Sequence, residues 1–184
     1  MKEAPVIMTP RLCLRPVSQT PAEALVAALA NYDVVRWLGN VTWPYGVEEA
    51  RAFLRRPNHG ATWHIWAGDA LVGGISTQTD FGFWIARAHW GRGYGPEAGA
   101  AVIEAHFDRV DAERLNAKVL PDNERSIAAL QRLGFQRAGM TTCDSASLGQ
   151  TLDGLAFRLT RADWGLSRGR FASIADAAER RVGQ

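Results

Sequence analysis

The chain has 184 residues, 47% of them apolar and 22% charged, and its 21 basic and 19 acidic residues leave a net charge of +2. A chain of this length can bury a core as one domain without disulfides or metal, and so balanced a charge argues against a nucleic-acid partner. Cys13 and Cys143 form no metal-ligand set. With no signal peptide and no membrane-length apolar run, the sequence predicts a cytoplasmic protein that binds no metal, no nucleic acid and no membrane.

The N-terminal part predicts strands that alternate with helices. Residues 11–16 alternate polar and apolar positions, which indicates a half-buried strand. Thr20, Pro21 and Glu23 predict an N-cap, a first helical residue and a capping box for a helix that reaches about Asn31. The next expected elements are a loop with one helical turn over residues 31–45, a helix over 47–55, and a hairpin of strands 62–66 and 71–76.

The stretch that follows has the form of an anion site. Residues 81–85, Phe-Gly-Phe-Trp-Ile, predict a buried strand, and Gly91, Gly93 and Gly95 then alternate ahead of Pro96. Pro96 suits the first helical position, and apolar residues continue at helical spacing to Phe107. Unpaired amides and the macrodipole at a helix start attract anions, and glycines let the backbone approach closely. The pattern therefore predicts a phosphate cradle, with an ordinary tight turn as the alternative.

The remaining segments continue the alternation. Residues 114–119 predict a strand, and Asn123 predicts the cap of a helix that ends at Gly134 in the left-handed conformation. A strand over 135–142, a polar loop over 144–153 and a strand over 155–160 complete the predicted sheet. Residues 165–184 predict an appended helix, capped by Ser173, that packs on the body or on a second subunit.

Four local motifs carry a resemblance to a known family. They are Thr9-Pro10-Arg11-Leu12-Cys13-Leu14-Arg15-Pro16; Gly82-Phe83-Trp84-Ile85 with Trp90-Gly91-Arg92-Gly93-Tyr94-Gly95-Pro96-Glu97-Ala98; Asn123-Glu124-Arg125-Ser126; and Leu133-Gly134-Phe135 with Gly139. In this order and spacing the chain resembles the GNAT superfamily of acyl-CoA-dependent N-acetyltransferases, and within it the branch of the ribosomal-protein N-terminal acetyltransferases.

The resemblance implies an α/β (α+β) GNAT fold. We expect a mixed, mostly antiparallel twisted sheet of about six to seven strands flanked by about four helices, plus a short C-terminal helix. The expected domain covers residues 1–164, with residues 165–184 as a C-terminal extension.

The same resemblance implies direct acetyl transfer from acetyl-CoA, as co-substrate, to a primary amine in a ternary complex. The amine would belong to a small molecule or a protein N-terminus, and the enzyme would be a monomer or homodimer without metal. Such a site must receive a neutral amine, polarise the thioester carbonyl and assist the departing thiolate. The acceptor cleft is expected between residues 37–45 and 144–153.

Coenzyme contacts are implied along the second and third motifs. Pro96 stands where the branch usually has Thr or Ser, so Gly91 to Gly95 must supply the amides, helped by the Arg92 guanidinium. Backbone amides near Trp84 and Ile85 would hold the acetyl and pantetheine carbonyls. The implied coenzyme-binding residues are Trp84, Ile85, Trp90, Gly91, Arg92, Gly93, Tyr94, Gly95, Pro96, Asn123 and Ser126.

Three residues are catalytic candidates, each with a structural alternative. Asn123 and Ser126 would face the pantetheine and sulfur, or simply form a helix cap. Asp80 matches a position where the branch often carries Glu, and would take a proton from the ammonium or anchor it; otherwise it is a turn residue. The following helix lacks the tyrosine acid of many relatives, so Ser126 or a water would protonate the thiolate, or it would leave unassisted.

Two other functions compete with the enzyme. A non-catalytic acyl-CoA-binding sensor or partner module stays open because the tyrosine is absent. A dinucleotide-binding dehydrogenase fits Gly93-x-Gly95-x-x-Ala98 loosely, but the turn follows a run of strands instead of opening a βαβ series.

Overall fold

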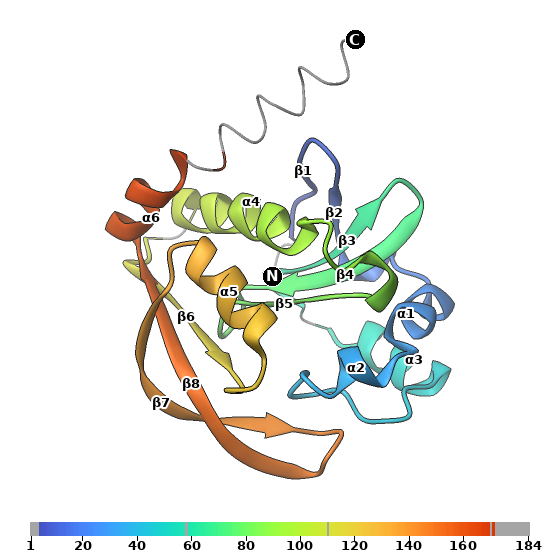
Figure 1. Cartoon of the computed structure of the whole chain (residues 1–184). Coiled ribbons are helices and arrows are strands. Elements are labelled where there is room, and N and C mark those ends of the chain that lie inside the picture. The colour runs from blue at the N-terminus through green and yellow to red at the C-terminus, as the bar shows by residue number, and fades with distance from the viewer. Residues whose placement is uncertain (1–3, 58, 110, 170, 172–184) are drawn as a thin grey trace.

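The computed structural model describes residues 4–57, 59–109, 111–169 and 171, which form two antiparallel sheets with helices around them (Figure 1). The strands are β1 (Ile7–Met8), β2 (Cys13–Pro16), β3 (Thr62–Ala67), β4 (Ala70–Ser76), β5 (Gly82–Ile85), β6 (Arg114–Val119), β7 (Gln136–Ser145) and β8 (Gln150–Thr160). The helices are α1 (Ala22–Leu29), α2 (Tyr32–Val35), α3 (Val47–Leu54), α4 (Tyr94–Arg109), α5 (Glu124–Arg132) and α6 (Arg161–Ser167), with 3-10 turns η1 (Val17–Gln19) and η2 (Arg87–His89).

The expected α+β class is confirmed, and its details are refined. Six α-helices lie in the described ranges where about four were expected. The additional ones are α2, which was expected as a single turn, and α6, which crosses the expected boundary at residue 164. Trp164 of α6 is buried and donates from Nε1 to Glu104 of α4 at 2.5 Å, so α6 packs on the body. The helix expected to begin at Ser173 lies outside the described residues.

The strands divide into a five-stranded sheet of order β1-β2-β3-β4-β5 and a three-stranded sheet of order β6-β8-β7. The Phe81 amide, which donates to the Asn116 carbonyl at 2.7 Å, ties the start of β5 to β6. Beyond that bond β5 pairs with β4 and β6 pairs with β8, so the two strands part as facing edges. The strand that was expected to be buried is only partly so: Phe81 is buried, but Phe83, Trp84 and Ile85 are half-buried, because an edge strand has a neighbour on one side only.

Two apolar cores cover opposite faces of the larger sheet. Along β3, Ile65 packs with residues of α4 and α5, whereas the adjacent Trp66 packs with α1, α2 and α3. Successive side chains of a strand point to opposite faces, so the four central residues of β3 are all buried. This double cover fixes β4 and β5 between the helix groups.

The polar loop expected over residues 144–153 is instead the end of a long β-hairpin. β7 and β8 pair from Gln136–Arg158 out to Ser145–Gln150 and form a long arm (Figure 1). Most residues of β7 are exposed. Toward the tip one face of β7 is half-buried or buried, but its residues are Thr141, Cys143 and Ser145, so the sequence lacks the apolar alternation that marks a strand. The turn still reaches the other expected wall of the acceptor cleft, since the Ala146 amide donates to the Gly39 carbonyl at 3.0 Å.

The capping box expected at α1 does not form. Pro21 is the N-cap and makes no side-chain cap bond. The Thr20 hydroxyl instead shares a hydrogen bond of 2.7 Å with Nδ1 of His64, which is 1% exposed. A buried imidazole must find a partner for its ring nitrogen, and here that need outweighs the cap.

The burial of His64 predicts a loss of stability in acid. Burial first, then the charge of His59, lowers the pKa of His64 from 6.5 to about 4. Between these two pKa values His64 is protonated in the unfolded chain but neutral in the folded protein. The contribution of neutral His64 to the free energy of unfolding is therefore complete above pH 6.5 and is lost as the pH falls toward 4. We expect a loss of about 3 kcal/mol in the free energy of unfolding, measured by denaturant titration across this range.

The variant His64→Gln is the control for this prediction, because its amide can still bond Thr20 but does not titrate. The pH dependence that disappears in the variant belongs to His64. Equal slopes in the two proteins would contradict the assignment.

The described residues contain no helix with the length and apolar character that crossing a bilayer requires.

Candidate active site

The predicted cradle follows β5 and η2 and leads into α4. α4 begins at Tyr94, two residues before the expected start, and its first backbone bond runs from the Glu97 amide to the Gly93 carbonyl at 3.2 Å. Pro96 is therefore the third helical residue, where its missing N–H leaves no helix bond unmade. The Tyr94 and Gly95 amides at this end have no intrahelical acceptor and can serve an anion.

The alternating glycines have two different roles. Gly91 and Gly93 adopt φ angles of +76° and +77°, a region that other residues rarely occupy. Gly95 instead allows close packing, because a Cβ there would lie 2.5 Å from Cε2 of Phe83. The turn therefore needs glycine for its shape, and the helix needs glycine to start against β5.

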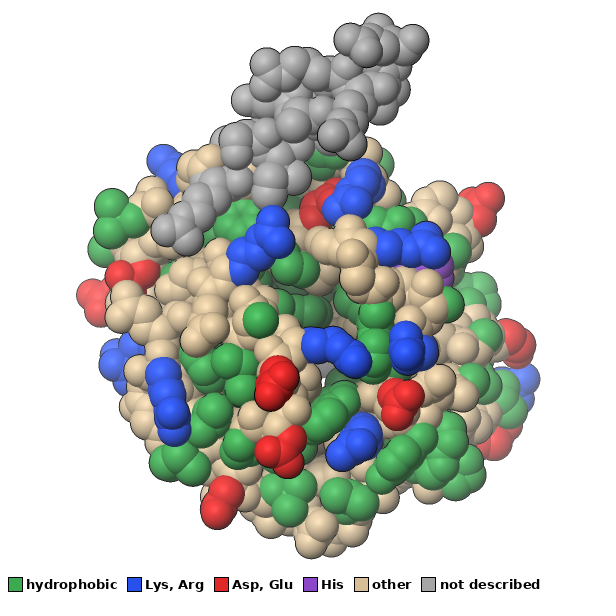
Figure 2. All heavy atoms as spheres, viewed as in Figure 1, with side chains coloured by type: hydrophobic (Ala, Val, Ile, Leu, Met, Phe, Trp, Pro, Cys, Tyr) green, Lys and Arg blue, Asp and Glu red, His purple; other side chains and the backbone are tan. Residues whose placement is uncertain are grey.

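Arginine side chains from both halves of the molecule meet beside the cradle. The guanidinium carbons of Arg125, in the first turn of α5, and Arg87, in η2, lie 4.0 and 4.6 Å from the Trp90 ring centroid. The Trp90 indole N–H donates to the Ile85 carbonyl at 2.7 Å, which fixes the ring. Figure 2 shows several Lys and Arg side chains near the middle of the face it draws, with Asp and Glu side chains beside them. The contacts of Trp90 with Arg87 and Arg125 connect η2 to α5, and they place two positive charges close to the glycine turn before α4.

The backbone of β5 alternates between pairing with β4 and facing away from it. The Ala86 amide donates to the Val72 carbonyl at 2.8 Å, and Trp84 pairs with Gly74 in the same phase. The groups of Phe83 and Ile85 are therefore directed away from β4, toward the side where β5 and β6 part. Of the amides expected near Trp84 and Ile85, that of Trp84 is used in pairing with β4, and those of Phe83 and Ile85 are the available donors.

The start of α5 forms the expected cap. Asn123 Oδ1 accepts from the Ser126 amide at 3.2 Å, and both residues are half-buried. The structural role that competed with a coenzyme role for Asn123 is thus present. The Asn123 amide nitrogen and the Ser126 hydroxyl take no part in this bond and remain chemically suited to a polar ligand.

Asp80 lies at the closed end of the gap between the sheets. It precedes Phe81, and its carboxylate is 3.7 Å from Nζ of Lys118 on β6, with side chains 32% and 48% exposed. The sequence predicted a carboxylate near the acceptor but not this cation beside it. Because exposed pairs of this kind contribute little stability, the pair does not by itself explain Asp80 as a structural residue.

The cradle, its helix and the parted strands coincide with a family match. Residues 11–136 match the model of the acetyltransferase (GNAT) domain. The chain belongs to the GNAT family.

Curated relatives agree with this membership. The chain is 28% identical over 151 residues to the uncharacterized N-acetyltransferase YoaA of Bacillus subtilis (strain 168), covering 74% of this chain and 85% of that one. It is 25% identical over 174 residues to the uncharacterized N-acetyltransferase p20 of Bacillus licheniformis, covering 86% and 97%. The protein is therefore a GNAT N-acetyltransferase, a class that uses acetyl-CoA.

A solved structure has a similar fold. RimJ of Mycobacterium smegmatis, determined in complex with CoA-disulfide, superposes with a TM-score of 0.73 at 21% identity and covers 95% of this chain and 94% of that one. At this identity the similarity concerns the fold alone.

In this GNAT protein, burial favours the neutral form of the Cys143 thiol and of two imidazoles. Burial raises the pKa of the Cys143 thiol, although Lys118 opposes it, so this thiol is a poor nucleophile at neutral pH. Burial lowers the pKa of His89 and His106 as well, with Arg92 and Arg161 adding to the effect.

Sequence reasoning missed three residues that the structure places at this candidate site. Phe83 was missed because a single strand does not reveal which amides face its partner. Arg87 and Arg125 were missed because their contact with Trp90 depends on bringing η2 and α5 together. Arg125 did stand inside a recognised motif, and that motif was the signal available.

Proposed function

We propose that this GNAT N-acetyltransferase moves the acetyl group of acetyl-CoA directly to a primary amine, with both substrates bound where β5 and β6 part. The observation that carries the proposal is a glycine turn and helix N-terminus placed at the end of an edge strand with unpaired amides. The amides of the glycine turn can bind the pyrophosphate of the coenzyme. The unpaired backbone groups of the β5 edge can bond the amides of its pantetheine arm. Both requirements meet within one short segment, residues 83–95.

In this proposal the phosphates bind the amides of Gly91 to Gly95, assisted by the exposed guanidiniums of Arg87, Arg92 and Arg125. Tyr94 and Gly95 contribute from the helix end, while Pro96 lines the turn without donating. Trp90 holds two of these arginines in place. Charge-assisted bonds to phosphate are stronger than neutral ones, so these contacts supply much of the donor affinity.

The transfer step follows from the edge of β5. An amide of Phe83 or Ile85 bonds the thioester oxygen, and this bond strengthens as the oxygen gains charge during attack by the amine. The amine nitrogen forms a bond to the acetyl carbon, the carbon–sulfur bond breaks, and the sulfur leaves as thiolate. Ser126, beside Asn123 at the start of α5, or a water relays to that thiolate the second proton, which the nitrogen loses as the amide forms.

The acceptor enters from the side of Asp80, between the Gly39 loop and the β7–β8 hairpin. Asp80 takes the proton that the ammonium must lose, directly or through water, while Lys118 holds its carboxylate in place. A protein N-terminus and a small-molecule amine both satisfy this chemistry. The finer assignment, to the branch of ribosomal-protein N-terminal acetyltransferases, predicts that peptides with a free N-terminus are the better acceptors.

The test is release of free thiol from acetyl-CoA in the presence of a panel of peptide N-termini, amino acids, polyamines and aminoglycosides. We expect steady release with at least one acceptor, one thiol for each acetyl group transferred, because direct transfer couples the two products. Tight acetyl-CoA binding without thiol release across the panel would favour the sensor instead. Release with small amines but no peptide would remove the branch assignment alone.

A further inference from the structure

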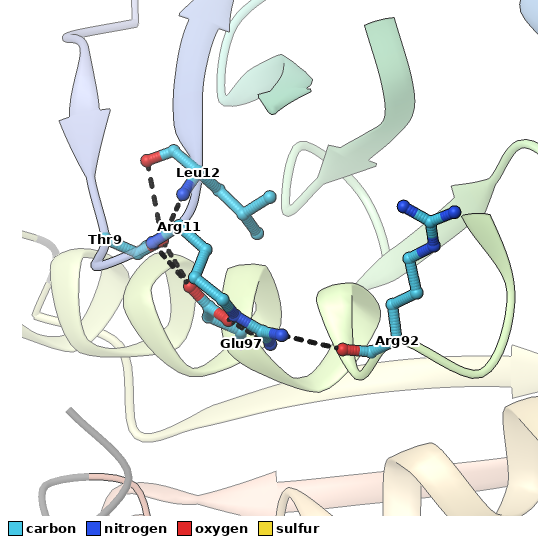
Figure 3. Close-up of polar contacts among 5 residues, drawn as sticks. All are labelled: Thr9, Arg11, Leu12, Arg92 and Glu97. Atoms are coloured by element: carbon cyan, nitrogen blue, oxygen red, sulfur yellow. Dashed lines mark hydrogen bonds and ion pairs between the residues drawn. The ribbon is translucent and has the colours of Figure 1, made fainter. Parts of the chain in front are cut away.

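The phosphate-binding turn is held from outside the cleft by a segment more than eighty residues earlier in the chain. Glu97, the fourth residue of α4, has a side chain only 11% exposed. One of its oxygens accepts from the Thr9 hydroxyl at 2.7 Å and the Arg11 amide at 3.1 Å. The other accepts from Nε of Arg11 at 2.7 Å and lies 2.5 Å from its Nη2 (Figure 3). Glu97 is thus saturated by the turn that precedes β2.

The same guanidinium touches the cradle itself. Nη1 of Arg11 donates to the Arg92 carbonyl at 3.0 Å, and the guanidinium carbon lies 5.0 Å from the Tyr94 ring centroid. A Cβ on Gly93 would lie 3.5 Å from Nη2 of Arg11. One side chain therefore bonds the turn at Arg92, lies over the Tyr94 ring and leaves little free space beside Gly93 between them.

The side chain of Arg92 points away from this cluster, while its carbonyl points into it (Figure 3). Turning the carbonyl toward Arg11 fixes the peptide plane between Arg92 and Gly93, and so the direction of the Gly93 amide. Gly93 adopts a φ of +77° here, but as a glycine it can also occupy other backbone regions, so its own sequence does not fix this peptide. An external clamp supplies the constraint that the glycine lacks.

We infer that Arg11 and Glu97 are positioning residues, which hold the Gly91–Gly95 amides in the geometry that binds the coenzyme phosphates. The inference rests on the proposed function, because it assigns the phosphates to this turn. Neither side chain is assigned a contact with substrate. Their effect is to remove alternative conformations of the turn before the donor arrives, and preorganisation of this kind appears as affinity.

The clamp makes a prediction that a general structural role does not. Arg11→Met should lower kcat/KM for acetyl-CoA by about 10- to 100-fold, mainly through KM, because a charge-assisted bidentate contact is lost. S-acetylpantetheine carries the same thioester without the pyrophosphate, so its kcat/KM should stay within about twofold of the wild-type value. Steady-state kinetics with both donors and one amine measure the two effects.

Other variants sharpen the test. Arg11→Lys should recover part of the loss, because it retains the charge but not the fork that spans Glu97 and the Arg92 carbonyl. Glu97→Gln should reproduce the Arg11→Met pattern and serves as the second variant if Arg11→Met folds poorly. Arg51→Met removes an exposed arginine of α3 that pairs with Glu48 at 3.0 Å. It lies outside the cradle, so this variant should have the wild-type kcat/KM with both donors.

The outcomes separate the inference from the proposed function. If the wild-type protein binds no coenzyme A by calorimetry, the proposed function fails. If the wild type binds and the folded Arg11→Met and Glu97→Gln variants keep its KM for acetyl-CoA, the inference is overturned and the function stands. Equal losses with both donors would assign Arg11 to general stability and would also overturn it.

Discussion

The variant Gly93→Val is expected to bind coenzyme A about 10- to 100-fold more weakly than the wild type. Gly93 adopts a φ of +77°, a conformation that strains a β-branched residue. The strain energy is of the same order as the free energy that corresponds to this loss of affinity. The valine would relieve the strain by turning the peptide, which redirects the amides of the cradle, and its Cβ would lie 3.5 Å from Nη2 of Arg11, so its methyl groups would also press on the side chain that holds the turn. Isothermal calorimetry with coenzyme A measures the change.

The control is Gly149→Val, in the turn between β7 and β8. Gly149 has a comparable φ of +65° and open space around its Cβ position, so it carries the same backbone strain without the ligand. Both variants should lose stability, and only Gly93→Val should lose affinity. A folded Gly93→Val protein with wild-type affinity would remove the phosphate assignment of this turn.

Asp80→Asn is expected to reduce kcat/KM for the amine by about 10²- to 10⁴-fold, the usual contribution of a general base. The acceptor ammonium is mostly protonated at neutral pH, and asparagine retains the size of aspartate but cannot take the proton. Coenzyme A affinity should hardly change, since Asp80 lies at the opposite end of β5 from the cradle. Partial rescue at high pH is expected, because free neutral amine then forms without the carboxylate.

Lys118→Met is the matched control, because it breaks the 3.7 Å pair and leaves the carboxylate in place. A base role predicts a much smaller effect for Lys118→Met than for Asp80→Asn. If the two variants behave alike, Asp80 acts only through the pair. Normal amine kinetics in Asp80→Asn at neutral pH would leave it a turn residue.

The sequence predicted local features whose cause is also local. Gly134 ends α5 with a φ of +95°, as expected of a residue after a helix, and Asn123 caps that helix. The strands from β3 to β6 begin and end close to the predicted residues. Their limits depend on the pattern of apolar residues and on the turn residues within each segment. The motifs located the cradle for the same reason.

Features that depend on residues far apart in the chain could not be predicted from the sequence. Thr20 has every property of an N-cap, but a buried imidazole more than forty residues away takes its hydroxyl. The choice between Phe83 and Trp84 as open donors depends on the register with β4. Arg11 was quoted within a motif without a role, because Glu97 becomes its neighbour only when β2 reaches α4.

The single backbone bond between Phe81 and Asn116 also bears on aggregation. Unpaired strand edges invite strands of other molecules to add to a sheet, and proteins usually shorten, charge or cover them. Here the edges of β5 and β6 face each other across the gap. β5 is only four residues long, and the exposed positions of β6 are Arg114, Asn116 and Lys118, which suit no apolar partner strand. The unpaired amides of β5 can therefore remain available to a ligand, while the short length of β5 and the polar positions of β6 disfavour the addition of a strand from another molecule.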